Sequence, residues 1–186
     1  MNNIKTFENF NNQDIFTYIE NNDIKSVKNY IDSGYDLNIQ DNYYTPLSYA
    51  TYYNNIEIVK LLLNAGADTN KQTIEGDAAL ILAARNKIEI VKLLLNAGAD
   101  ADKQDYYNNT ALILAAYKNN REIVEILLDY GADEFILNDE NKSFYDYLND
   151  ENQQYFAQNY PTSVYNAISH WYKKSFTEFV KDYNVK

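Results

Sequence analysis

The sequence predicts an all-α protein built as a solenoid of stacked helix–turn–helix repeats. The segment IEIVKLLLNAGAD occupies residues 56–68 and returns unchanged at residues 88–100. A related copy, REIVEILLDYGAD, spans residues 121–133, and a more divergent one, IKSVKNYIDSGYD, spans residues 24–36. The glycines that close the four copies are 32, 32 and 33 residues apart. A fixed period near 33 residues indicates a repeat array, in which each unit buries its apolar face against the next.

The composition of the 186 residues narrows the functional classes. A hydrophobic content of 46% is too high for a disordered chain. The net charge of −11 disfavours nucleic acid and anionic membranes as partners, because both attract basic surfaces. The absence of cysteine excludes disulfides, thiolate metal sites and cysteine nucleophiles. No run is apolar enough for a signal peptide or a membrane span, so we expect a cytoplasmic protein.

The first unit is expected at residues 13–40, after a polar segment at residues 1–12 that predicts a tail or one short helix. Apolar residues at helical spacing predict two helices, around residues 15–19 and 24–31, joined by a tight link. This unit is more polar than the later ones, as is typical of a terminal cap with one face in water.

The second unit, residues 41–72, carries clear signals for the ends of its helices. Thr45 suits the N-cap, and Pro46 suits the first helical position, where a missing N–H costs nothing. Asn54 and Asn55 are expected to end this helix, because asparagine tolerates the left-handed conformation. Gly66 ends the second helix, whose inward face is predicted at Ile58, Val59, Leu62 and Leu63.

The start of each first helix carries a motif that is similar to a known family. TPLSYA begins at Thr45, AALILA at Ala78 and TALILA at Thr110, and Gly-Ala-Asp closes three units. These features resemble the ankyrin repeat, with its T-P-L-H-x-A signature, two antiparallel helices and a β-turn finger. The resemblance covers residues 13–150. It implies about three full repeats, divergent N- and C-terminal capping units and an extra C-terminal helix, with units at 13–40, 41–72, 73–104, 105–137 and, partially, 138–150.

The third unit departs from this pattern. It has Ala78 where the neighbouring units have threonine, so its helix cap is expected to come from elsewhere, and a missing cap costs about 1 kcal/mol. It is also one residue shorter between its helices, while the second unit is one residue shorter in its turn. Packing between the units is expected to outweigh these losses.

Residues 151–186 are predicted to form a C-terminal helical cap. A short helix is expected around Phe156, Pro161 breaks it, and Thr162 or Ser163 can cap a last helix. That helix carries an apolar stripe at Val164, Ile168, Trp171, Tyr172, Phe176, Phe179 and Val180. The stripe is expected to cover the last repeat; the alternative is a docking helix for a partner or a second copy.

The sequence does not indicate an enzyme, and we expect no cofactor and no metal. His170 is the only histidine, and no phosphate-binding loop or nucleophile motif is present. The aspartates that follow the repeat glycines are better explained by stabilised turns than by calcium binding; they are Asp68, Asp100 and Asp133.

The resemblance also implies where a partner would bind. Members of the family bind partner proteins through a concave surface formed by the β-turn tips and the exposed ends of the first helices. We call the corresponding thirteen positions the finger surface: Tyr43, Tyr44, Tyr52, Tyr53, Ile74, Glu75, Asp77, Arg85, Tyr106, Tyr107, Asn109, Tyr117 and Lys118. Asn42 at the first tip and Asn86 at the end of a first helix also correspond to positions of this surface, and the one-residue deletions fall beside them.

Seven of the thirteen positions are tyrosine, a residue that is enriched at binding hot spots. The chain uses tyrosine freely, 19 times in all, so part of this enrichment reflects composition. We expect a non-catalytic, monomeric module that binds another protein and neither nucleic acid nor membrane. The alternatives are a scaffold that self-associates through the C-terminal helix, and an effector delivered to a host cell.

Overall fold

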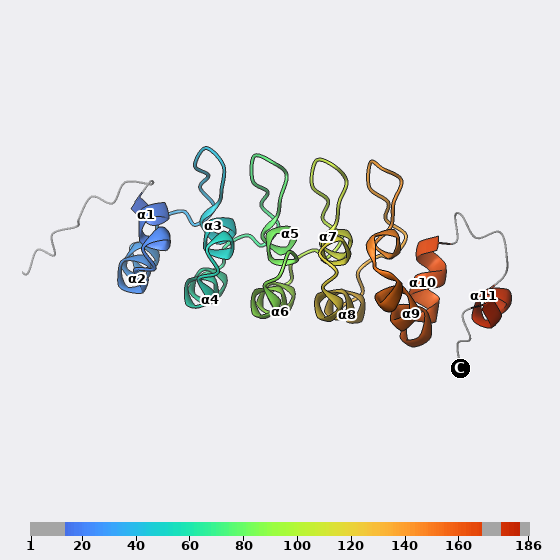
Figure 1. The fold of residues 1–186 in the computed structure, drawn as a ribbon. Helices are drawn as coiled ribbons and strands as arrows, with labels where there is room; N and C mark the ends of the chain where they lie inside the picture. The colour runs from blue at the N-terminus through green and yellow to red at the C-terminus, as the bar shows by residue number, and fades with distance from the viewer. Residues whose placement is uncertain (1–13, 169–175, 183–186) are drawn as a thin grey trace, which may run out of the picture.

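The computed structural model describes residues 14–168 and 176–182, and its helices form one row of stacked hairpins (Figure 1). The first helices of the four leading units are α1 (Asp14–Glu20), α3 (Pro46–Tyr52), α5 (Ala79–Ala83) and α7 (Ala111–Tyr117). The second helices are α2 (Ile24–Asp32), α4 (Ile56–Asn64), α6 (Ile88–Asn96) and α8 (Arg121–Asp129). Each first helix contacts the next first helix, and each second helix contacts the next second helix. The all-α solenoid is confirmed: the described residues contain no strand.

The repeated segment forms the buried side of the second helices. Ile58, Val59 and Leu62 of α4 are fully buried, and the same three positions are fully buried in α6 and α8. Burying each such side chain is worth about 1.5–3 kcal/mol, so these positions carry much of the stacking energy. The predicted fourth position, Leu63, is only half-buried.

The link between the two helices of a unit depends on one left-handed residue. Asn22, Asn54 and Asn119 take it at φ 52°, 60° and 54°, which confirms the role that the sequence predicts for asparagine after the first helix of the second unit. The link of the third unit is one residue shorter and contains no left-handed residue, because Asn86 does not take that conformation. Its first helix, α5, is also short, with 5 residues instead of the 7 of α3 and α7.

The helix caps agree with the sequence in two units and correct it in the third. Thr45 caps α3, and its side chain and that of Ser48 bond reciprocally to the backbone in a capping box. Thr110 caps α7 by accepting a hydrogen bond from the backbone N of Ile113 at 3.3 Å. The cap of α5 was expected from elsewhere; instead α5 follows Ala78 with no side-chain cap.

The aspartates that follow the repeat glycines do stabilise turns. Asp68 Oδ1 accepts a hydrogen bond from the backbone N of Asn70 at 2.8 Å, and Asn70 Oδ1 accepts one from the backbone N of Asp100 at 2.9 Å. Asp100 and Asp133 bond the residue two positions on in the same way. Each of these aspartates therefore closes its own turn, and the turns of neighbouring units are bonded to one another from the first unit to the fourth.

The chain beyond the fourth unit continues the two rows. The 3₁₀ helix η1 (Tyr145–Tyr147) packs against α7, and α9 (Asp150–Asn159) lies beside α8 (Figure 1). The Arg121 guanidinium stands 4.7 Å above the Tyr155 ring at this contact. α10 (Pro161–Ile168) then packs against η1 and α9 and buries Val164 and Ile168, the first two residues of the apolar stripe.

The predicted last helix differs in its start. It begins at Pro161 rather than after a cap at Thr162 or Ser163, because proline suits the first helical position. A further helix, α11 (Phe176–Asp182), contacts α10, and the Phe176 ring meets the Tyr165 ring at 5.2 Å. Residues 169–175, with His170 and the expected stripe residues Trp171 and Tyr172, and the tail at residues 1–12 lie outside the described residues.

Candidate functional site

The β-turn fingers extend from the same edge of the row, at residues 41–44, 73–77, 105–109 and 138–142 (Figure 1). Backbone bonds join neighbouring fingers: the N of Ile74 donates to the O of Tyr43 at 3.0 Å, and the N of Asp139 donates to the O of Tyr107 at 3.1 Å. Gln72 adds a side-chain bond to the backbone O of Gln104 at 2.8 Å. The fingers therefore form a connected edge rather than independent loops.

The finger surface holds most of the large apolar side chains that the described residues expose. Ten such side chains are exposed, and seven of them are finger-surface positions: Tyr43, Tyr52, Tyr53, Ile74, Tyr106, Tyr107 and Tyr117. Tyrosines elsewhere include buried ones, such as Tyr30 and Tyr145. Six of the seven exposed tyrosines among the described residues are therefore on the finger surface, and Tyr130 is the seventh.

The remaining finger-surface positions differ in accessibility. Glu75, Arg85 and Lys118 are exposed, whereas Tyr44 and Asn109 are half-buried. Asp77 is buried, with its residue only 5% exposed. The sequence places Asp77 on the surface, but its carboxylate lies beneath it.

Tyrosine rings pack together at the N-terminal end of the finger surface. Tyr52 contacts both Tyr44 and Tyr53, with ring centroids 5.5 and 5.4 Å apart. Tyr49, at a position that sequence reasoning did not select, lies under them and contacts Tyr53 at 4.9 Å. Burial, together with the Tyr53 hydroxyl, raises the pKa of Tyr49. These contacts hold the exposed rings in fixed positions.

At the centre of the finger surface, the carboxyl of Asp77 is buried and its pKa is raised. It precedes α5 at the place that Asn109 occupies before α7, and its Oδ2 lies 3.4 Å from Nη2 of Arg85. Burial raises its pKa to about 6, Arg85 opposes this shift, and the charges of Asp105 and Glu75 add to it. The pair therefore buries one carboxyl beside a half-exposed guanidinium.

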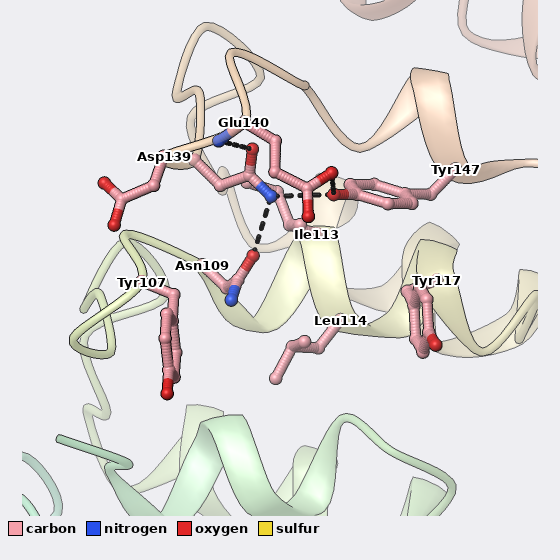
Figure 2. A pocket seen from close by; sticks show the side chains of 9 residues that line it. Tyr107, Asn109, Ile113, Leu114, Tyr117, Asp139, Glu140 and Tyr147 are labelled. Carbon is pink, nitrogen blue, oxygen red and sulfur yellow. Dashed lines mark hydrogen bonds between the residues drawn. The ribbon is translucent and has the colours of Figure 1, made fainter. Parts of the chain in front are cut away.

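A pocket of about 300 Å³ opens at the C-terminal end of the finger surface. Figure 2 shows Tyr107 and Tyr117 on either side of Leu114, with Tyr147 above Tyr117 and its hydroxyl directed toward Glu140. The Tyr117 and Tyr147 rings meet edge-on with centroids 5.7 Å apart. The remaining lining residues are Asn109, Ile113, Asn138, Asp139 and Glu140.

Polar contacts fix the rim of this pocket. Asn138 Nδ2 donates to Asn109 Oδ1 at 2.9 Å and to the Tyr147 hydroxyl at 2.8 Å. The Tyr147 hydroxyl donates in turn to Glu140 Oε2 at 3.2 Å (Figure 2). Lys142 Nζ donates to the same oxygen at 2.7 Å, and this contact holds the pKa of Glu140 below its usual value.

Sequence reasoning missed the part of the pocket that the fifth unit supplies. Tyr147, Asn138 and Glu140 come from the finger at residues 138–142 and from η1. A signal was present for the finger, because Asp139 and Glu140 stand one period of 33 residues after Tyr106 and Tyr107. Tyr147 corresponds to Leu114, which is not a finger-surface position, so the repeat pattern did not indicate it. The predicted surface stopped one unit early.

Two other features are relevant to function in the part of the chain that the structure describes: metal-binding groups and membrane-spanning helices. That part holds no group of His, Cys, Asp or Glu side chains that could bind a metal ion. Nor does any helix within it have the length and apolar character needed to span a membrane.

The comparisons with known proteins agree with the architecture. A comparison with curated proteins found no match. A family model described as ankyrin repeats in three copies matches residues 15–105 and 65–141, which is more than half of the chain. The chain therefore belongs to the ankyrin repeat family, whose repeats generally mediate protein–protein interaction.

Proposed function

We propose that this protein is a non-catalytic module that binds another protein through the finger surface, extended by Tyr147 and Glu140 of the fifth unit. The observation that carries the proposal is the concentration of exposed aromatic side chains there: six of the seven exposed large side chains on this surface are tyrosine. Tyrosine offers a large, stiff contact area and a hydroxyl at little cost in conformational entropy.

The rigidity of the fingers supports this proposal. A surface whose loops are already bonded to one another loses less conformational entropy on binding than a set of free loops. The bonds from Ile74 to Tyr43 and from Asp139 to Tyr107 supply that order, as do the ring contacts among Tyr44, Tyr52 and Tyr53.

The charge of the protein favours a particular kind of partner. The net charge is −11, and carboxylates at Glu75, Asp139 and Glu140 lie along the fingers. We propose a protein partner with a basic or mixed surface, which would associate faster at low salt. Nucleic acid and membrane are not proposed as partners, and the protein is proposed to act as a monomer, which light scattering after size exclusion would test.

The test is a double substitution at the most exposed finger. Tyr106→Ala with Tyr107→Ala removes two side chains that are each 69% exposed. Because hot-spot residues contribute about 2 kcal/mol or more, we expect capture of the protein partner to weaken at least tenfold. Circular dichroism is expected to show an unchanged fold, since both side chains lie largely in solvent.

The matched control removes two exposed aromatic side chains away from the fingers. Tyr130 and Phe135, which follow α8, are 49% and 57% exposed. Tyr130→Ala with Phe135→Ala is expected to keep full capture. Equal capture by both double variants would assign binding to another surface.

A further inference from the structure

We infer that the pocket between Tyr107, Tyr117 and Tyr147 receives an arginine side chain of the partner. This inference rests on the proposed function and specifies the chemistry that one part of the finger surface recognises. It depends on three features of the pocket: its aromatic walls, its acidic rim and its size.

The aromatic walls come from three separate elements. Tyr107 belongs to the finger at residues 105–109, Tyr117 ends α7, and Tyr147 lies in η1. Aromatic faces attract cations placed within about 6 Å of the ring. Two of these rings already make cation–π contacts with lysines of this chain. Lys118 Nζ stands 5.2 Å from the centroid of the Tyr117 ring, and Lys142 Nζ stands 5.0 Å from the centroid of the Tyr147 ring.

The rim supplies negative charge. Asp139 and Glu140 line the pocket, and among the described residues no basic side chain does. The contacts of Glu140 with Tyr147 and Lys142 both fall on Oε2, which leaves Oε1 for a donor from the partner. Asp139 Oδ1 accepts from Asn108 Nδ2 at 2.6 Å and adds charge from the edge. A cation entering here would meet both aromatic side chains and carboxylates.

The shape favours arginine over lysine. At about 300 Å³ the pocket is at the small end of the range for ligand sites, which suits a single side chain. A guanidinium is planar and weakly hydrated, so it stacks on tyrosine while its N–H groups still reach a carboxylate. Leu114 and Ile113 line the pocket where the methylene groups of the arginine would pack. A lysine ammonium would lose more hydration for fewer bonds.

The experiment is a titration of the full-length protein with N-acetyl-arginine-N-methylamide, followed by amide shifts in NMR spectra. We expect saturable shifts that centre on Tyr107, Leu114 and Tyr117. The citrulline counterpart has nearly the same shape without the charge, and we expect at least tenfold weaker binding. Equal binding of the citrulline or lysine counterparts, or shifts centred elsewhere, would overturn the inference.

Three variants test the contacts individually. Tyr117→Ala and Glu140→Gln are expected to weaken arginine binding about three- to tenfold, while Tyr130→Ala, at an exposed position away from the fingers, leaves it unchanged. Lys142→Gln is expected to strengthen it severalfold, because Glu140 then has no internal counter-charge. A purely structural role for these residues would not produce opposite signs at Glu140 and Lys142. Weaker binding by Lys142→Gln would count against the inference.

The outcome separates this inference from the proposed function. If the finger double variant loses its partner while the arginine probe does not bind, the protein-binding function stands and the arginine pocket is wrong. If the probe binds while capture is the same in the finger variant and its control, the pocket stands as a cation site and the proposed docking surface is wrong.

Discussion

Gly76 lies directly against Tyr106 of the next finger. A Cβ placed on Gly76 would stand 2.7 Å from Cδ1 of Tyr106 and 2.8 Å from its backbone N. Gly76 is also left-handed, with φ 82°. This close approach of two fingers sets the position of Tyr106, one of the most exposed tyrosines of the finger surface. A side chain at residue 76 would push the two fingers apart.

Gly76→Ala is therefore expected to destabilise the protein through two effects. A side chain in the left-handed region costs about 1–2 kcal/mol, and overpacking adds about 1–3 kcal/mol. We expect a loss of roughly 2–5 kcal/mol in the free energy of unfolding, measured by urea denaturation.

Gly98→Ala is the matched control for this substitution. Gly98 has φ 83°, but a Cβ there meets nothing within 4 Å. It should therefore show the backbone cost alone, about 1–2 kcal/mol. Equal losses for the two variants would mean that the fingers separate freely and that the contact with Tyr106 has no cost.

A second prediction concerns the buried carboxyl of Asp77. Its pKa in the folded protein is raised from 3.8 to about 6, so the folded protein holds this proton more tightly than the unfolded chain. The resulting stability is fully present below pH 3.8 and is lost as the pH rises through about 6. Asp77→Asn removes the ionisation, and asparagine already occupies the equivalent place at Asn109. We expect this variant to be more stable than the original by on the order of 2 kcal/mol at pH 8.

The pH profile is the measurement that decides this prediction. The gain from Asp77→Asn should shrink toward zero between pH 6 and pH 4 in urea denaturation series. Glu75→Gln removes the same charge from an exposed position two residues away and controls for the change in net charge. A gain from Asp77→Asn that did not vary with pH would show that the ionisation of Asp77 is not its source.

Most of the fold followed from residues that repeat. The second helices could be predicted because IEIVKLLLN must bury the same face in each unit. The helix ends could be predicted because Asn54 and Gly66 are residues that readily take the left-handed conformation. The boundaries at Pro46 and Thr110 followed from the same local chemistry.

The rest depended on contacts between units, which no single repeat encodes. The burial of Asp77 results from its position between Arg85 and the next finger, although its neighbours in the pattern are surface positions. The pocket needs Tyr147 from η1, where the repeat pattern has degenerated and the first helix is reduced to a 3₁₀ turn. The position of a residue within its repeat therefore predicts which side of a helix it occupies better than it predicts how exposed its side chain is.

A third prediction follows from a buried hydroxyl in α3. Thr51 is fully buried, and its Oγ1 has no hydrogen-bond partner among the described residues. The equivalent positions in the next two units are Ala84 and Ala116. An unsatisfied buried hydroxyl costs about 1–3 kcal/mol, while the lost methyl is worth about 0.8 kcal/mol. We expect Thr51→Ala to stabilise the protein by roughly 1 kcal/mol in thermal or urea unfolding.

Two further substitutions separate the hydroxyl from the methyl group. Thr51→Val keeps the methyl and removes the hydroxyl, so it should be at least neutral. Thr51→Ser keeps the hydroxyl and removes the methyl, so it should destabilise by about 1 kcal/mol. Stabilisation by serine and not by valine would show that the site is too crowded rather than unsatisfied.

The last prediction uses the uneven capping of the first helices. Thr110→Ala removes the bond to the backbone N of Ile113 and should cost about 1 kcal/mol. Ala78→Thr offers the same cap to α5, at a position as buried as Thr45 and Thr110, and should return up to about 1 kcal/mol. Urea unfolding of both variants measures the two effects. Ala78 and Thr110 have the same extended backbone, so a threonine at either position could cap its helix. If Ala78→Thr lowered the stability as Thr110→Ala does, the short α5 would have no room for a cap. The third unit would then be held by stacking alone.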